Sequence, residues 1–238
     1  MSNFKNVEAF NRLIGICTGY GGAYNPGSPN LHIESLSELL TQARTVLLQV
    51  SVAKTGFENA TNQREVVFNQ ASQIASRILS ELKSASALPQ TIADAALMVR
   101  KIRGRARTAM VEVKQEGAEA ITMLKRFRIT GTGYESAVYH FEKLITTLEA
   151  ETRFNPGIAA LQIPALKQLL VNMRTSNQAV IDAYSNLSQL RIQRNQLLYR
   201  SEGSMYKTAR AVKEQIRALF GARSETAGAA NRISLRTN

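Results

Sequence analysis

The residues best suited to acid–base or nucleophilic chemistry are few in this sequence. His32 and His140 are its two histidines, and Cys17 is its single cysteine. Neither histidine has a Cys, Asp or Glu at the spacing of a metal site, and a lone histidine usually has a structural role. Cys17 falls on an apolar helical stripe, which is typical of a small buried hydrophobic residue. These residues therefore predict neither a metal centre nor an activated nucleophile.

Two further patterns are candidates for phosphate binding or proton transfer. Residues 19–22 (Gly-Tyr-Gly-Gly) could bring backbone N–H groups near an anion, but they lack the Lys-Ser/Thr of a P-loop. The carboxylate pairs Glu112 with Glu116 and Glu149 with Glu151 have no apolar setting that would raise a pKa for acid catalysis. We therefore expect no enzymatic activity and no cofactor.

Positive charge is the most distinctive chemical feature of the chain. The formal net charge is +12; residues 100–128 hold +6, residues 191–236 hold +7, and the rest sums to −1. Such surfaces attract phosphate-rich or acidic partners. The predicted contacts to such a partner are Arg100, Lys101, Arg103, Arg105, Arg107, Arg191, Arg194, Arg200, Lys207, Arg210, Lys213 and Arg217.

The same charges have a second interpretation, which the sequence leaves open. The densest run, residues 100–107, could be a solvated helix face or a basic helix end that interacts with the helix macrodipole. No ribonucleoprotein motif, zinc finger or basic zipper accompanies the charges. Aromatic residues interleaved with the cations for stacking on single-stranded bases are also missing, since Phe127 and Phe220 are isolated neighbours of basic residues. Nucleic acid is therefore an alternative partner and not the leading one.

The elements that position these residues follow from an internal repeat. When the Asn-Pro-Gly turn at 25–27 is placed over the one at 155–157, an offset of 130, residues 25–53 match residues 155–183 at twelve of twenty-nine positions without a gap. An offset of 131 aligns the segments before the turns. Helical periodicity alone does not explain the matched turn, so the pattern predicts a tandem duplication.

Each copy is predicted to contain a short amphipathic helix, an Asn-Pro-Gly loop and a long helix. The expected fold class is all-α, an elongated helical bundle with pseudo-two-fold symmetry. Its expected parts are a first helical unit at residues 1–130 and a second at residues 131–221, packed with the first in one bundle. Residues 222–238 are expected to form a mobile C-terminal tail.

The long helices carry apolar stripes with three- and four-residue spacing. In the first copy only Gly56 threatens a helix of about 50 residues, or about 75 Å, which Leu88-Pro89 should end. A third helix is predicted over residues 90–127, weakened at Gly104 and Gly117. In the second copy Gly203 should interrupt the chain before a helix over residues 205–220, with Gly221 as its C-terminal cap.

Arg64 and Arg194 occupy equivalent positions inside these apolar stripes. An unpaired charge buried there would be costly. One interpretation is a buried polar layer that sets the register between the copies and pairs with carboxylates such as Glu65 or Asp182. The other is that the stripe drifts around the helix, so that both arginines reach water.

Composition agrees with a folded helical protein. Hydrophobic residues make up 44% and charged residues 20%, which is too apolar for a disordered chain. Helix-favouring residues are plentiful and Trp is absent. A single cysteine favours a reducing compartment, and no signal segment or run of 18 apolar residues is found. We expect a cytoplasmic protein with no membrane span.

Several short motifs are spread over nearly the whole chain. They are Tyr24-Asn25-Pro26, Lys101-Ile102-Arg103-Gly104, Phe141-x-x-Leu144-Ile145, Phe154-Asn155-Pro156, Arg194-Asn195-x-x-Leu198-Tyr199 and Val212-Lys213 followed by Phe220-Gly221. In these motifs the chain resembles a family of uncharacterised all-helical proteins from Bacteroidetes bacteria. The resemblance implies a helical fold and brings no activity, cofactor or partner.

These observations favour a non-enzymatic, cytoplasmic structural, assembly or protein-binding scaffold. The near-heptad stripes predict self-association, so the expected partner is a second copy of the chain or another protein. The alternative is a nucleic-acid-binding protein that contacts phosphates through its basic helix faces.

Overall fold

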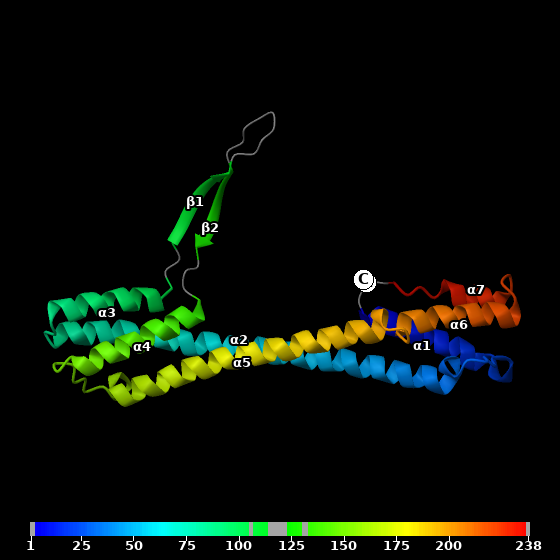
Figure 1. Ribbon diagram of the computed structural model, residues 1–238, viewed down its shortest axis with the longest axis horizontal. Helices are drawn as coiled ribbons and strands as arrows, with labels where there is room; N and C mark the ends of the chain where they lie inside the picture. Colours follow the sequence, from blue (N-terminus) through cyan, green and yellow to red (C-terminus); the bar gives the residue numbers. More distant parts are fainter. Residues whose placement is uncertain (1–2, 105–106, 114–122, 130–132, 237–238) are drawn as a thin grey trace. The chain divides into compact units, whose positions relative to one another are not determined.

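The structure is a computed structural model that describes residues 3–104, 107–113, 123–129 and 133–236. Side chains are described for residues 3–104 and 133–236. The described chain is mainly helical, which confirms the predicted helical fold (Figure 1). The α-helices are α1 (Asn3–Gly19), α2 (Ile33–Ser84), α3 (Pro89–Ile102), α4 (Tyr134–Ala150), α5 (Ile163–Asn195), α6 (Met205–Phe220) and α7 (Glu225–Arg232).

Helix α2 is continuous over 52 residues and passes through Gly56 without a break. It contains no proline, and Leu, Ala, Gln and Glu are frequent along it, so local preferences support its length of about 78 Å. It ends when Ser86 adopts a positive φ of 51°. Pro89 then takes the first position of α3, where its missing N–H is not needed. The end predicted near Leu88-Pro89 is confirmed.

Helix α5 ends in a different way. Its last turn widens into a π-helical turn, η4 (Gln196–Arg200), and the chain then leaves the helix before α6 begins. The predicted interruption at Gly203 is therefore confirmed, as are the bounds of α6. Gly221 closes α6 with a φ of 86°, and its N–H donates to the Arg217 carbonyl at 2.9 Å. A residue with a Cβ is strained at that φ, which explains the glycine.

Two segments of the chain share one order of elements. Helices α1 and α4 each have 17 residues and start 131 positions apart. The 3-10 turns η2 (Pro29–Leu31) and η3 (Ala159–Leu161) follow, and α2 and α5 begin at Ile33 and Ile163, all at an offset of 130. The residues before these helices, His32 and Gln162, have φ, ψ of −65°, 149° and −69°, 147°.

The chain divides into two compact units whose limits differ from the predicted unit boundaries. The first unit joins Met1–Glu58 to Ala183–Asn238, and the second is Asn59–Asp182. Each unit thus contains the beginning of one long helix and the end of the other. The reason is that α2 and α5 are long enough for their two ends to contribute to different cores.

The core of the first unit is formed by α1, the first part of α2, α6 and α7 (Figure 1). Phe10 and Leu13 of α1 are fully buried and mark its centre. The apolar residues of α6 recur at positions 205, 209, 212 and 216, which gives one continuous buried face. Burial of such side chains provides the main stabilisation of the unit, at about 1.5–3 kcal/mol for each large residue.

The core of the second unit is formed by the second part of α2, α3, α4 and the first part of α5 (Figure 1). Phe141 and Leu144 of α4 are fully buried. Ala71 and Ala75 of α2 are also fully buried, and such small residues let neighbouring helices approach closely. Met98 and Val99 of α3 complete the same apolar cluster.

The predicted third helix over residues 90–127 is wrong in its length. Helix α3 ends at Ile102, and Gly104 takes a positive φ of 58°, a conformation that stops a helix. Two antiparallel strands follow, β1 (Arg107–Val113) and β2 (Met123–Ile129), with Arg107 opposite Ile129. Their β-branched and aromatic residues suit a strand better than a helix. Gly117, the second predicted weak point, lies outside the described residues.

The expected mobile tail at residues 222–238 contains a helix. Ser224 caps α7, since its side chain accepts from the Ala227 N–H at 3.1 Å. Ala227 and Ala230 are buried in the core of the first unit. Farther on, the Arg236 N–H donates to the Asn6 side chain at 3.1 Å. The small residues Ala227 and Ala230 therefore pack α7 against the core of the first unit, although the composition of residues 222–238 resembles that of a flexible tail.

Candidate functional site

The predicted basic residues of α3 lie on its exposed side. Ala95, Met98, Val99 and Ile102 turn to the core of the second unit, so Arg100, Lys101 and Arg103 project to solvent at the helix end. The free carbonyl groups at a helix C-terminus attract cations, which accounts for basic residues in the last turn. Gly104 then ends the helix directly after them.

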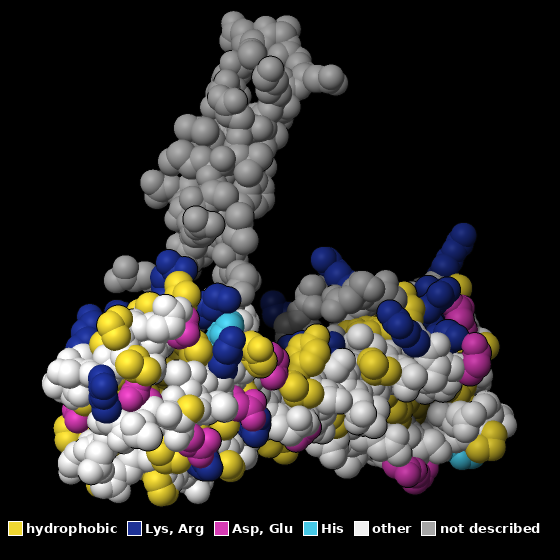
Figure 2. Space-filling model, turned by 60° about the vertical axis from the view of Figure 1, so that its left-hand side comes forward, with side chains coloured by type: hydrophobic (Ala, Val, Ile, Leu, Met, Phe, Trp, Pro, Cys, Tyr) yellow, Lys and Arg dark blue, Asp and Glu magenta, His cyan; other side chains and the backbone are white. Residues whose placement is uncertain are grey.

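A pocket of about 490 Å³ lies between these residues and α4. The face drawn in Figure 2 shows Lys and Arg side chains on both sides of a histidine in this region. We call it the α3–α4 pocket. Its lining residues are Asp94, Leu97, Met98, Arg100, Lys101, His140, Lys143 and Thr147.

The cations of the α3–α4 pocket differ from other cations of the same unit in their partners. Arg174 lies 2.7 Å from a carboxylate oxygen of Glu142, and Lys167 lies 2.6 Å from one of Glu149. Among the described residues, Arg100, Lys101 and Lys143 have no such carboxylate partner. The pocket therefore gathers positive charge that the described part of the chain does not neutralise by ion pairs.

The pKa of His140 is affected by this positive charge. Burial lowers the pKa of its imidazole, and the ammonium groups of Lys101 and Lys143 lower it further because they disfavour a second positive charge nearby. Its ring packs edge-on against Tyr139, with centroids 5.1 Å apart. The sequence did not connect His140 with the basic residues of α3, because the connection depends on how α3 and α4 pack.

The predicted cations of α6 are mostly engaged within the chain. Lys213 donates to the Ile233 carbonyl, and Arg217 contacts Glu214 at 2.7 Å and the Asn231 side chain at 3.0 Å. Burial, followed by the charge of Arg217, lowers the pKa of Lys213. Arg210 is exposed beside them. This surface offers less unpaired charge than the α3–α4 pocket.

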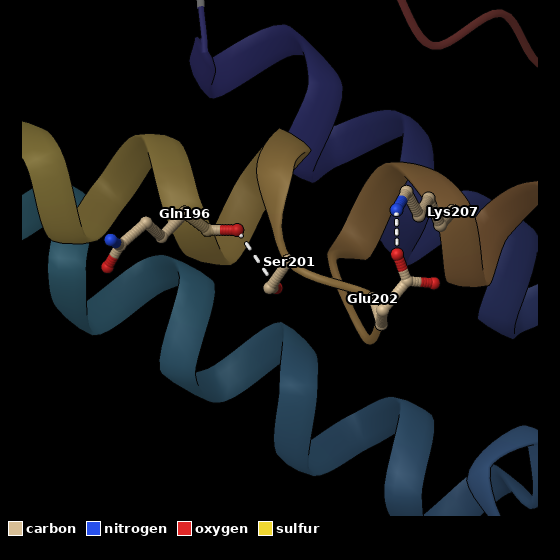
Figure 3. A network of polar contacts seen from close by, with 4 residues as sticks. All are labelled: Gln196, Ser201, Glu202 and Lys207. Carbon is tan, nitrogen blue, oxygen red and sulfur yellow. Dashed lines mark hydrogen bonds and ion pairs between the residues drawn. The ribbon is translucent and has the colours of Figure 1, made fainter.

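The break between α5 and α6 holds the network drawn in Figure 3. Ser201 donates from its hydroxyl at 3.0 Å to the carbonyl of Gln196, the first residue of η4, and its N–H donates to the same carbonyl at 3.1 Å. Lys207 donates to Glu202 at 2.8 Å. The hydrogen bond and charge of Lys207 lower the pKa of Glu202. Lys207, a predicted phosphate contact, thus already has an acidic partner.

No protein-family model, curated protein or solved structure matches this chain.

The remaining predicted phosphate contacts have varied settings. Arg191 and Arg200 are exposed, on α5 and at the end of η4. Arg194 is half-buried and donates to the side chain of Asn195 at 2.9 and 3.1 Å. Arg105 lies outside the described residues. Arg107 is the first residue of β1, and its side chain is outside the described part.

Arg64 has a partner that the sequence did not suggest. Its guanidinium lies 3.9 Å from the centre of the ring of Tyr134, which is the first residue of α4. Phe68 packs edge-on against the same ring. A cation over an aromatic face is attracted by about 0.5–2 kcal/mol. Arg64 belongs to the second unit and Arg194 to the first. The register-setting layer of Arg64 and Arg194 remains a prediction.

Cys17 and His32 are in structural positions. Cys17 is buried, and burial raises the pKa of its thiol to about 11, so the reactive thiolate is scarce near neutral pH. The His32 imidazole lies 3.1 Å from the Pro26 carbonyl across the first loop. Within the described residues, no group of three His, Cys, Asp or Glu side chains could hold a metal ion.

A second candidate surface lies on α2 in the first unit. Positions 41, 45, 48, 52 and 55 follow four- and three-residue spacing, and all five side chains are exposed and uncharged. Leu48 and Val52 are 65% and 64% exposed, which is unusual for adjacent apolar residues on one helix face. We call this stripe the α2 face. Its residues are Thr41, Thr45, Leu48, Val52 and Thr55.

None of the described helices is both long enough and apolar enough to cross a lipid bilayer.

Proposed function

We propose that this protein is a non-enzymatic cytoplasmic scaffold that self-associates through the α2 face. The observation that carries the proposal is the exposed pair Leu48 and Val52 on a helix of 52 residues. Apolar residues at three- and four-residue spacing are the sequence pattern by which helices pack side by side. A second copy would bury both side chains, each of which contributes about 1.5–3 kcal/mol when fully removed from water.

Charge favours the α2 face over other surfaces for a second copy. Two chains of net charge +12 repel each other wherever their cations approach. The five side chains of the α2 face are uncharged, and the exposed cations nearest to them on α2, Arg44 and Lys54, lie 3.7 Å and 3.6 Å from carboxylate oxygens of Glu8 and Glu58. Two copies that meet there therefore bring little unpaired positive charge into contact. The threonines can lie at the rim of such an interface, because their hydroxyl groups bond to the carbonyl four residues earlier, as Thr45 does to Thr41 at 2.9 Å.

We propose in addition that the chain arose by tandem duplication and has pseudo-two-fold symmetry. The equal lengths of α1 and α4 and the common offset of η2 with η3 support this origin. Phe10 and Phe141, 131 positions apart, are both fully buried. A single copy would leave the core of each unit without the helices of the other copy, so duplication gives a chain that completes both cores.

The scaffold proposal predicts concentration-dependent assembly. Sedimentation velocity over a concentration series should show the wild-type chain moving from monomer to dimer. A double substitution, Leu48→Glu with Val52→Glu, places two carboxylates in the contact and should weaken association at least tenfold. Helicity should be unchanged, because both positions are exposed and Glu favours helix.

Leu219→Glu is the matched control for this experiment, because Leu219 is a partly exposed leucine of α6 in the same unit. It should associate as the wild type does. A wild-type chain that stays monomeric at all concentrations would refute self-association, and equal loss in the control would show that the α2 face is not the contact.

Nucleic-acid binding is the second candidate function. It is supported by the cations of the α3–α4 pocket, which have no carboxylate partner among the described residues. Because phosphate contacts release counterions, retention on RNA or DNA at low salt should be lost steeply near about 0.15 M salt. Retention of this kind by a strictly monomeric chain would favour nucleic-acid binding over the scaffold.

A further inference from the structure

We propose that the α3–α4 pocket is a binding site for a phosphate group. The site is separate from the α2 face and does not depend on self-association. Arg100 and Lys101 reach the pocket from α3, while Lys143 and His140 reach it from α4. Arginine and lysine are the side chains that proteins use most to bind phosphate, as a planar fork and as a point charge respectively.

Helix-end electrostatics explains only part of this cluster. Arg100 and Lys101 are in the last turn of α3, where cations are favourable. His140 and Lys143 are in the interior of α4, which extends from Tyr134 to Ala150, so the α4 terminus does not account for them. Their approach to the α3 cations brings like charges together, which costs free energy unless an anion lies between them.

The remaining lining residues agree with a phosphate carried on a larger molecule. Asp94 is the only acidic residue among the lining residues, so the pocket remains positive overall. Leu97, half exposed, and Met98 give part of the wall an apolar character. A pocket of about 490 Å³ is also larger than one phosphate ion needs. The phosphate could belong to a small phosphoester or to a nucleic-acid backbone, and both present the same group to these cations.

Binding should be linked to a proton on His140. The charged and titratable groups that line the pocket with it are Asp94, Arg100 and Lys101 of α3 and Lys143 of α4. Burial, followed by the charges of Lys101 and Lys143, holds the pKa of His140 below its ordinary value. A bound phosphate opposes their effect and raises that pKa, so protons are taken up on binding. For a phosphodiester, whose charge is constant in this range, affinity should therefore increase as pH falls through the titration range of His140.

The test uses NMR titration of the full chain, whose two histidines give two imidazole signals that His140→Asn assigns. Inorganic phosphate should raise the pKa of His140, compared with sodium chloride at equal ionic strength, and should not change the position of the His32 signal. Lys143→Gln removes one contacting cation and should weaken phosphate binding about tenfold. It should also raise the pKa of His140 in the absence of phosphate, while the far-ultraviolet circular dichroism spectrum stays unchanged. The spectrum is needed because unfolding would raise that pKa as well.

Lys83→Gln is the control for charge, since Lys83 is an exposed lysine of the same unit outside the pocket lining. It should bind phosphate as the wild type does. A second titration with a short single-stranded RNA separates the sources of the group: a response to RNA at much lower concentration than to phosphate assigns the pocket to a nucleic-acid backbone. If neither ligand moves the His140 signal, or if Lys83→Gln and Lys143→Gln weaken binding equally, the proposal is overturned.

Discussion

Phe141→Ala is expected to lower the free energy of unfolding of the second unit by about 3–5 kcal/mol. The ring is fully buried at the centre of the core that α2, α3, α4 and α5 form. Truncation removes a large apolar surface from that core and leaves a cavity that fully buried neighbours such as Leu144 and Leu166 fill only in part. A loss of this size is a large fraction of the stability of a small compact unit.

Hydrogen exchange followed by mass spectrometry can locate the loss within the chain. Phe141→Ala should increase exchange in residues 134–150, and Phe10→Ala should do the same in residues 3–19, because Phe10 is fully buried in the core of the first unit. Phe4→Ala is the control, since that ring is 64% exposed on α1 and its removal should cost little. Uniform destabilisation of the whole chain by either core substitution would contradict separate cores for the two units.

The helices that were predicted correctly are those with strong local signals. The apolar stripe and proline-free sequence of α2 outweigh Gly56, which costs only about 1 kcal/mol relative to alanine. Gly221 and the residues before α6 likewise mark helix ends by their own backbone preferences. These elements depend on residues a few positions apart, so the sequence contains the information in a form that can be read directly.

The strands β1 and β2 were missed because their pairing is not local. Arg107 lies opposite Ile129, and Val113 lies opposite Met123, across a connection of several residues. Basic residues there suited a helix equally well, and the helix stop at Gly104 depends on a positive φ, which a glycine does not always adopt, as Gly56 within α2 shows. The β-branched residues of β1 were the signal that favours strand.

Only the α3 side of the α3–α4 pocket was predicted from the sequence, because the α4 side depends on contacts that are not local. Arg100 and Lys101 stood out as part of a dense basic run, which is visible in sequence alone. His140 and Lys143 belong to a helix about 40 positions later, and only the packing of α4 on α3 brings them to the same pocket. The contact between Arg64 and Tyr134 is a second example of a non-local contact. The sequence spacing of the two residues does not indicate that the cation lies over the ring.

A second large effect on stability is expected from substitutions at Gly56, because α2 is continuous through this residue. Gly56→Pro removes a backbone N–H from the middle of the helix and sets the proline ring against the preceding turn, which costs about 3 kcal/mol or more. Gly56→Ala should instead raise the free energy of unfolding. The added Cβ meets no atom within 4 Å, and alanine is favoured over glycine by about 1 kcal/mol in a helix interior. Urea unfolding followed by circular dichroism at 222 nm measures both changes.

Gly221→Ala separates helix propensity from a general preference for alanine. Its Cβ also meets no atom within 4 Å, but the residue has a φ of 86°, so the same substitution should destabilise by about 1 kcal/mol. Stabilisation at Gly56 together with destabilisation at Gly221 is expected only if α2 is helical through residue 56. Because Thr55 directly precedes Gly56 and Val52 lies one helical turn before it, a break there would also disturb the α2 face, and Gly56→Pro should weaken self-association together with stability.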